Sequence, residues 1–561
     1  MSNPADRMNA STLQRLCAAP DRQLLHAVEP IYGDSSDICR ERVALLANVT
    51  AKYLSEFGDG PVRVFRCPGR INLRGMHVDT HGGYLNLMTH QREVIVVASP
   101  TEDATFRLRN LDPEFAPLDF DSAVWAQHPA FNTAWDRFIT DASVQSRVLS
   151  RRGHWANYVE GAIARIQHHR NGQPLTGFRA VVGSDLPRGA ALSSSTALIL
   201  AIIQTVSALN EIAVDPKTLI RLGQESEWYA GARTGMSDQT AMVLGGRDSF
   251  VNVAIHPDDL ALNAARYSSF PDGLAVLVVD SHTTRSLSGA QLVEYTRNRF
   301  AYSLALEVLR QELAAMGMDA EAIAGIRYLS DLNAARLADW GGPASLYECL
   351  KRIDESIDIA ALGARYDLPQ LPGEYERYFG TVEEELRPKT INLRGPLLFG
   401  IAESERARVF PDLLAEGEFE EAGGLMTVGH DGDRVLDRCG KRFASDVGDA
   451  SLDRLAKAAT PVEYCPGAYG ASSPALDFIV DQALDAGALG ASLTGGGIAG
   501  AVLVLSLAPD AGRICEAIAS QLATERYQRI AKLEEPIGSG LATASIVRNH
   551  GVAGVGEIPL V

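Results

Sequence analysis

A run of small residues followed by three serines is the part of the chain best suited to bind an anion. Residues 189–191 are Gly-Ala-Ala, and serines occupy 193–195 after Leu192. Serine is favoured at helix N-termini, and residues 196–209 are apolar on nearly every face, as in a buried helix. The free N–H groups and positive end of such a helix bind phosphate. The sequence therefore predicts a phosphate loop, with a tight turn into a core helix as the alternative.

A second polar cluster follows a predicted strand. Residues 61–66 alternate like a strand, and residues 67–83 then place Arg70, His77 and Asp79 among glycines and a proline. Polar groups concentrated beside a strand end are typical of a ligand loop. A hairpin with solvated charges is the alternative.

The third candidate is a carboxylate at a helix start. Residues 217–230 form a charged helix that carries Glu225 and Glu227, and residues 231–246 then place Asp238 where another helix begins. A helix N-terminus favours the ionised carboxylate, which suits a group that must be an anion at neutral pH. A helix-capping aspartate is the alternative.

A glycine-rich stretch near the end of the chain does not indicate a dinucleotide fold. Gly495, Gly497 and Gly500 satisfy the pattern GxGxxG, but a β-rich segment follows where that pattern requires a helix. A hairpin that allows close backbone approach to another loop fits residues 487–505 better. The chain also lacks GxxxxGK[ST] and is therefore not a P-loop kinase.

Length and composition set broader limits. At 561 residues, with 46% apolar and 22% charged residues, the chain is typical of a soluble globular protein with two or more domains. A net charge of −18 argues against a general nucleic-acid binder. Seven scattered cysteines without CxxC pairs indicate reduced thiols in a cytoplasmic protein. The N-terminus lacks signal-peptide features, and no apolar run is long enough to span a membrane. No feature of the sequence sets the oligomeric state.

Together these stretches resemble the GHMP family of small-molecule kinases, and within it the galactokinase group. Residues 68–79, 186–197 and 493–500 are similar to the three family motifs, in the family's order. Residues 235–239 are similar to the segment that carries the family's catalytic aspartate. Segments that look particular to galactokinases occupy residues 155–158, 285–288 and 295–299.

The resemblance implies an α+β fold of two domains with the active site in the cleft between them. We expect an N-terminal extension over residues 1–60 and an ATP- and sugar-binding domain over residues 61–285. A C-terminal domain would occupy residues 286–561. Within it, residues 317–405 show little periodic order and look like a partly helical insertion that covers this domain.

The resemblance also implies ATP-dependent phosphorylation of a sugar at its anomeric hydroxyl. Asp238 would be the base, and Arg70 would pair with it and with the transferring phosphoryl group. Phosphoryl transfer depends on positioning and charge neutralisation, with a carboxylate to orient or deprotonate the hydroxyl, and arginine matches phosphate oxygens. The ATP phosphates would be cradled by Gly189, Ala190, Ala191, Leu192, Ser193, Ser194 and Ser195.

Metal and sugar ligands follow from the same resemblance. Ser195 and Glu227 would hold Mg²⁺, with Glu225 as the rival carboxylate. The sugar would be contacted from the second cluster and the segment before Asp238, by His77, Asp79 and Gly235, with Met76 at a specificity position and Tyr295 nearby.

Three positions depart from the galactokinase pattern, which usually has glutamate at Met76, an apolar residue at Arg74 and alanine at Thr196. In galactokinases that glutamate accepts a hydrogen bond from an outer hydroxyl of the hexose, whereas a thioether is a weak acceptor. We therefore expect a sugar that is galactose-like in the ring but altered at its far end. A pentose such as L-arabinose, a 6-deoxy sugar or a substituted hexose would fit. A uronic acid would also fit if Arg74 turned inward. Alternatively, Met76 only repacks the loop and galactose binds through a water.

A non-catalytic sugar and ATP sensor on the same scaffold is the other class of function. Changes in the serine loop tend to mark such regulators. Here the serines at 193–195, Arg70 and Asp238 are all present, which favours catalysis.

Overall fold

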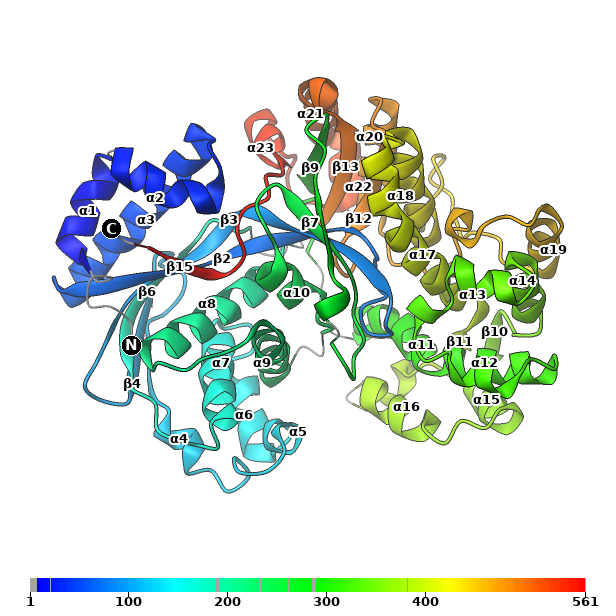
Figure 1. Ribbon diagram of the computed structural model, residues 1–561, viewed down its shortest axis with the longest axis horizontal. Helices are drawn as coiled ribbons and strands as arrows, with labels where there is room; N and C mark the ends of the chain where they lie inside the picture. Colours follow the sequence, from blue (N-terminus) through cyan, green and yellow to red (C-terminus); the bar gives the residue numbers. More distant parts are fainter. Residues whose placement is uncertain are drawn as a thin grey trace.

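The computed structural model describes residues 8–20, 22–187, 192–231, 234–260, 262–284, 289–380 and 382–559 (Figure 1). The side chains of residues 36, 263, 289–292, 294 and 295 also lie outside this description. Two main sheets carry helices on their faces, so the fold is α+β, as the family resemblance implies.

The larger sheet has nine strands and is antiparallel except where β4 runs parallel to β6. Its main path is β1 (Met8–Asn9), β2 (Pro61–Arg74), β3 (Tyr84–Pro100), β6 (Phe178–Ser184), β4 (Thr105–Asn110) and β5 (Leu118–Asp121). Three strands lie off this path: β7 (Ser249–Ala254) pairs with β3, β8 (Arg266–Ser269) with β7, and β15 (Gly556–Ile558) with β2.

Alternating side chains give this sheet two apolar faces. Val64 and Val97 belong to a buried cluster with helices α1 (Ala10–Ala18), α2 (Arg22–Tyr32) and α3 (Ser36–Phe57). Their neighbours Phe65 and Val96 point the other way, into a cluster with α7 (Ala156–His169) and α8 (Ser194–Leu209). Figure 1 shows α1–α3 and α7–α9 on opposite sides of the strands. The other helices on the side of α7 and α8 are α4 (Ala123–Ala126), α5 (Trp135–Ile139), α6 (Ala142–Ser150), α9 (Pro216–Tyr229) and α10 (Ser237–Leu244).

Strand β2 is longer than the sequence pattern predicts. Pro68 and Gly69 disfavour a regular strand, so the sequence suggested a loop from residue 67. In the structure β2 continues to Arg74, and a register shift between Pro68 and Gly69 marks an irregularity in its pairing with β3. Arg70 is therefore a strand residue, and the connecting turn is limited to residues 75–83.

The smaller sheet has the order β12 (Gly490–Thr494), β13 (Ala501–Leu507), β9 (Leu274–Asp280) and β14 (Ile546–Arg548), all antiparallel. β12 and β13 form the predicted glycine-rich hairpin around residues 495–500. Helices α20 (Pro474–Asp485), α21 (Ala511–Leu522), α22 (Glu525–Ala531) and α23 (Ser539–Ala544) supply its apolar cluster.

Two strands pair outside the unit in which the predicted boundaries place them. β9 falls within residues 61–285 yet pairs with β13, and β15 falls within residues 286–561 yet pairs with β2. The tail before β15 explains the second case: the Val552 N–H donates to Thr89 Oγ1 at 2.9 Å, and Arg66 Nη1 donates to the Ala553 carbonyl at 2.7 Å. These bonds draw the end of the chain back onto the larger sheet.

Residues 317–405 are mostly helical and share a fourth buried cluster with the long helices α11 (Gly289–Ala315) and α17 (Arg394–Glu416). This region holds α12 (Ala320–Ala324), α13 (Ala334–Asp339), α14 (Pro343–Lys351), α15 (Ile359–Arg365), α16 (Leu371–Phe379), β10 (Ser356–Asp358) and β11 (Thr390–Asn392). Helices α18 (Phe419–Asp433) and α19 (Asp449–Ala458) follow α17. Within the described ranges, none of the helices is both long enough and apolar enough to cross a membrane.

Candidate active site

Asp238 lies in the first turn of α10 and accepts hydrogen bonds from two other motifs. Arg70 Nε donates to its Oδ1 at 2.7 Å, and the Ser193 hydroxyl donates to its Oδ2. Burial raises the pKa of this carboxyl, but the charge and hydrogen bond of Arg70 and the hydroxyls of Ser193 and Ser237 outweigh it and leave the pKa below its usual range. Asp238 is thus an anion at neutral pH, as its helix position predicts.

Asp79 lies against the segment that leads into α10. Its Oδ2 accepts from the Ser237 hydroxyl at 2.9 Å and from the Ser237 N–H at 3.4 Å. A Cβ on Gly235 would lie 1.9 Å from Asp79 Oδ2, so only glycine allows this approach. The structure therefore joins the second cluster to the Asp238 segment through Gly235 and Ser237. Ser237 was not singled out from the sequence, although a serine beside a helix start was a usable signal.

The serine loop ends in a left-handed residue that points to the same carboxylate. Ser193 precedes α8 with φ 58° and ψ 52°, and Ser194 and Ser195 open the helix. The Leu192 carbonyl accepts the Arg70 N–H at 3.4 Å, which ties the loop to β2. Gly189, Ala190 and Ala191 of the predicted phosphate loop lie outside the described residues.

Glu227, near the end of α9, is buried and bound only by neutral donors among the described residues. Its Oε1 accepts from Thr196 Oγ1 at 2.5 Å, and its Oε2 accepts from Thr234 Oγ1 at 2.5 Å and from Gln239 Nε2 at 3.1 Å. Burial, and then the negative charge of Asp238, raise the pKa of Glu227 to about 7 against these hydrogen bonds. The departure at Thr196 thus supplies a hydroxyl to the predicted metal carboxylate.

Glu225, the rival carboxylate, is engaged elsewhere. Its Oε2 accepts from Arg165 Nε of α7 at 2.6 Å, and its main-chain carbonyl accepts from the Trp135 indole N–H at 3.0 Å. Two residues along a helix turn a side chain to the opposite side. Glu225 therefore points away from Thr196, and the geometry favours Glu227.

The two residues predicted to hold magnesium, Ser195 and Glu227, have the chemistry that this ion prefers. Mg²⁺ prefers oxygen ligands and is usually held by one or two protein carboxylates together with substrate phosphates. The Ser195 hydroxyl and Glu227 carboxylate are oxygen donors, and a carboxyl with a raised pKa and no cationic donor among its described partners is suited to a divalent cation. No group of three or more His, Cys, Asp or Glu within the described part of the chain could hold a metal by itself. Phosphate oxygens would thus have to complete the coordination.

His77 turns toward the smaller sheet. It has a left-handed φ of 63°, its ring stacks on Tyr469 with centroids 4.5 Å apart, and its Nε2 lies 3.4 Å from Asp433 Oδ1. Within the described residues this buried nitrogen has no hydrogen-bond partner. His77 Nε2, two residues before Asp79, therefore lies within ion-pair distance of Asp433 without forming a hydrogen bond to a described residue.

Met76 and Arg74 do not present free polar groups. Met76 is 1% exposed and belongs to a buried cluster that includes Tyr302, Phe399 and Tyr469. Arg74 is fully buried and donates through Nε to Glu403 Oε1 at 3.1 Å. The expectation of an acidic sugar depended on an inward-turned Arg74, and this ion pair removes its support. Tyr295 lies in α11, but its side chain, like residues 285–288, is outside the described part.

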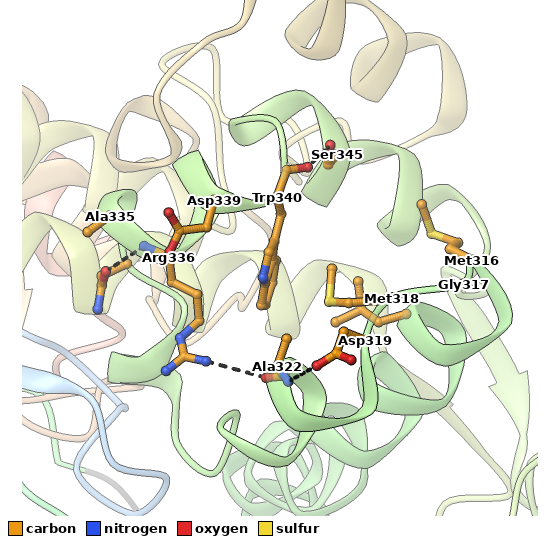
Figure 2. A pocket seen from close by; sticks show the side chains of 12 residues that line it. Met316, Gly317, Met318, Asp319, Ala322, Ala335, Arg336, Asp339, Trp340 and Ser345 are labelled. Atoms are coloured by element: carbon orange, nitrogen blue, oxygen red, sulfur yellow. Dashed lines mark hydrogen bonds between the residues drawn. The ribbon is translucent and has the colours of Figure 1, made fainter.

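A cavity of about 810 Å³ lies away from these residues, among α11–α14. Figure 2 shows Trp340 near its centre, with Arg336 on one side and Met318 on the other. It contains none of the residues predicted for the site.

Comparisons with known proteins agree with the grouping of these motifs. A family model described as "GHMP kinases N terminal domain" matches residues 157–246, which hold the serine loop, Glu227 and Asp238. A second, "Galactokinase galactose-binding signature", matches residues 51–100, which hold Arg70 and Asp79.

Similar whole chains are also known. The chain is 27% identical over 481 residues to a galactokinase of Chloroflexus aggregans, covering 85% of this chain and 92% of that protein. Its fold is similar to that of Lactococcus lactis galactokinase complexed with galactose, with a TM-score of 0.57, 19% identity and coverage of 91% of this chain and 98% of the other. Methanococcus jannaschii mevalonate kinase matches with a TM-score of 0.42, 14% identity and coverage of 82% and 94%. This chain thus carries a GHMP kinase N-terminal domain and a galactokinase galactose-binding signature, and it is similar to a galactokinase over most of its length.

Proposed function

We propose that this protein is a sugar kinase that transfers the γ-phosphoryl group of ATP to the anomeric hydroxyl of a galactose-like monosaccharide. The arrangement around Asp238 carries the proposal. This carboxylate is bonded at once to Arg70 of the second cluster and to Ser193 of the serine loop, and Ser237 links it to Asp79. The similarity to galactokinases supports a sugar as the acceptor.

In this mechanism Asp238 orients the sugar hydroxyl and receives its proton as the new O–P bond forms and the bond to ADP breaks. The low pKa of Asp238 makes it a weak base at neutral pH. That suits phosphoryl transfer, because its loose transition state needs orientation more than early deprotonation. Arg70 holds the carboxylate and places a positive charge beside the transferring group. Magnesium, held by Ser195 and Glu227 when bound, would neutralise charge on the phosphate oxygens.

Two parts of the turn after β2 would recognise the sugar: His77 and Asp79 would bind its ring, and Met76 would face its far end. Asp79 is fixed by Ser237, and His77 Nε2 lies 3.4 Å from Asp433 but makes no hydrogen bond to a described residue, so we expect both side chains to bind ring hydroxyls. Met76 offers only a thioether, and an unpaired buried hydroxyl costs about 1–3 kcal/mol. We therefore propose a sugar with the galactose ring and no hydroxyl at its far end, such as D-fucose or L-arabinose.

ATP consumption with D-galactose, D-fucose, L-arabinose and D-galacturonate tests the proposal. We expect ADP to form with at least one sugar, with kcat/KM for D-fucose about ten-fold above that for D-galactose. Met76→Glu should reverse this preference, whereas Met76→Leu, which keeps the apolar volume, should not. Binding of sugar and ATP without ADP formation in any arm would instead indicate a sensor. If wild type prefers galactose and Met76→Glu leaves that preference unchanged, the argument about the far end of the sugar is wrong. The proposal of a sugar kinase is not affected by that result.

A further inference from the structure

A buried ion cluster outside the proposed reaction lies directly beneath the turn that carries His77 and Asp79. It consists of Arg74 at the end of β2 and of Glu403 and Arg406 on α17, whose side chains are at most 1% exposed. Arg74 donates to Glu403 Oε1 through both Nε and Nη2, and Arg406 Nε donates to Glu403 Oε2 at 2.7 Å. The cluster therefore joins the larger sheet to a helix more than three hundred residues further along the chain.

Glu403 also binds the backbone of the turn itself. Its Oε1 accepts the Gly75 N–H at 2.8 Å and the Met76 N–H at 3.0 Å. Burial by itself would raise the pKa of Glu403. The positive charges of Arg74 and Arg406 have the larger and opposite effect, and they lower this pKa to about 2. The carboxylate is thus a permanent acceptor for these two N–H groups, and charged hydrogen bonds of this kind are the stronger ones.

The turn needs such support because its backbone is unfavourable. Gly75 has φ 95°, and a Cβ there would lie 2.4 Å from the Tyr84 carbonyl oxygen. His77 is left-handed although it is not glycine, an unfavourable conformation that persists only where the surroundings impose it. Asn72 Nδ2 donates to the Gly75 carbonyl at 3.1 Å, which fixes the other side of the turn.

Arg74 and Arg406, which hold Glu403, also bind residues of the C-terminal part of the chain. Arg74 Nη1 donates to the Met426 carbonyl at 3.2 Å and to Ser492 Oγ at 3.3 Å. Arg406 Nη1 donates to the Cys465 carbonyl at 2.8 Å. The carboxylate therefore has a fixed position, and the turn takes its position from it.

We propose that Glu403 is a positioning residue for sugar binding: it holds the backbone of residues 75–76 so that His77 and Asp79 face the sugar. It touches no substrate and acts through the turn. This inference rests on the proposed sugar-kinase function.

A matched control lies two residues further along the same helix. Glu405 is 2% exposed, and its two oxygens accept from Arg408, each at 2.7 Å. It also accepts the Ala334 N–H at 3.2 Å, so its contacts lie on the side of the helical insertion. Glu403→Gln and Glu405→Gln thus each neutralise a buried carboxylate paired with an arginine three residues downstream.

The test compares steady-state kinetics of the full chain carrying each substitution. We expect Glu403→Gln to raise the sugar KM about ten-fold or more while the ATP KM changes less than about two-fold. Glu405→Gln should leave both within about two-fold of wild type. Glu403→Asp, which keeps the charge but withdraws the carboxylate, gives an intermediate sugar KM and serves if the glutamine variant does not fold. Equal sugar KM values in the Glu403 and Glu405 variants would overturn the proposal.

Amide hydrogen exchange provides a readout that needs no activity. The Gly75 and Met76 amides should be protected in wild type and in Glu405→Gln but exchange faster in Glu403→Gln or Glu403→Asp. Unchanged protection would overturn the positioning role even if the protein is a sugar kinase. Faster exchange in the Glu403 variants, together with a wild-type chain that phosphorylates no sugar, would instead refute the proposed function and retain Glu403 as the support of the turn.

Discussion

The surroundings of Asp238 and Glu227 differ in one respect that decides the charge of each carboxyl. Both are packed beside the start of α8, and burial raises the pKa of both. Asp238 meets the Arg70 guanidinium, which holds its pKa low, whereas Glu227 meets hydroxyls and an amide, and its pKa rises to about 7. The partner therefore sets the ionisation. Asp238 is an anion paired with a guanidinium, whereas Glu227 has no cationic side chain among its described partners.

Removing the anion should have the largest effect. Asp238→Asn keeps the size of the side chain and its ability to accept from Ser193, but it cannot take the proton of the sugar hydroxyl. We expect kcat to fall by ~10² or more with ATP affinity largely unchanged. Single-turnover phosphoryl transfer and ATP titration check this. Turnover close to wild type would move the base to another residue.

Substitution of Glu227 should change how strongly the activity depends on magnesium. Glu227→Gln keeps acceptor and size but removes the charge, so the Mg²⁺ concentration for half-maximal rate should rise about ten-fold or more. Glu225→Gln is the matched control, because that carboxylate pairs with Arg165. Its magnesium dependence should equal that of wild type. The opposite pattern would reassign the ligand to Glu225.

The contact between Asp79 and Gly235 offers a smaller, steric test. A Cβ at residue 235 would overlap Asp79 Oδ2, so Gly235→Ala should displace that carboxylate and raise the sugar KM by roughly ten-fold, with less effect on ATP. Gly273→Ala is the control, since a Cβ there meets nothing within 4 Å. Equal sugar KM values for the two alanine variants would remove Asp79 from the sugar site.

Local sequence patterns predicted the parts of the site that depend on one element. The helix start at Asp238 and the buried helix after the serines could be predicted because capping and apolar periodicity are short-range signals. The pairing of Arg70 with Asp238 came only from the family resemblance. Glu403 carried no local signal, because its contact with Gly75 spans 328 residues and exists only once both sheets are assembled. The extension of β2 past Pro68 was missed because a pairing irregularity accommodates a residue that normally ends a strand.

The smallest predicted effect is on stability, and it separates the two carboxyls by the sign of their pH dependence. Because the folded protein raises the pKa of Glu227 from 4.5 to about 7, the folded state binds a proton more tightly than the unfolded chain. Its contribution to stability is fully present below about pH 4.5 and is lost as the pH rises through about 7. Asp238 behaves in the opposite way: its lowered pKa contributes stability above its ordinary pKa, which is lost only as the pH falls through the folded value. The pH ranges over which the two contributions change therefore do not overlap. The free energy of unfolding of wild type minus that of Glu227→Gln should decrease between about pH 5 and about pH 8, measured by denaturant titration without magnesium. Magnesium with an ATP analogue should reduce this decrease, because the cation favours the ionised carboxylate. A difference that stays constant over this range would mean that Glu227 is already ionised in the folded protein, and the contrast with Asp238 would then be lost.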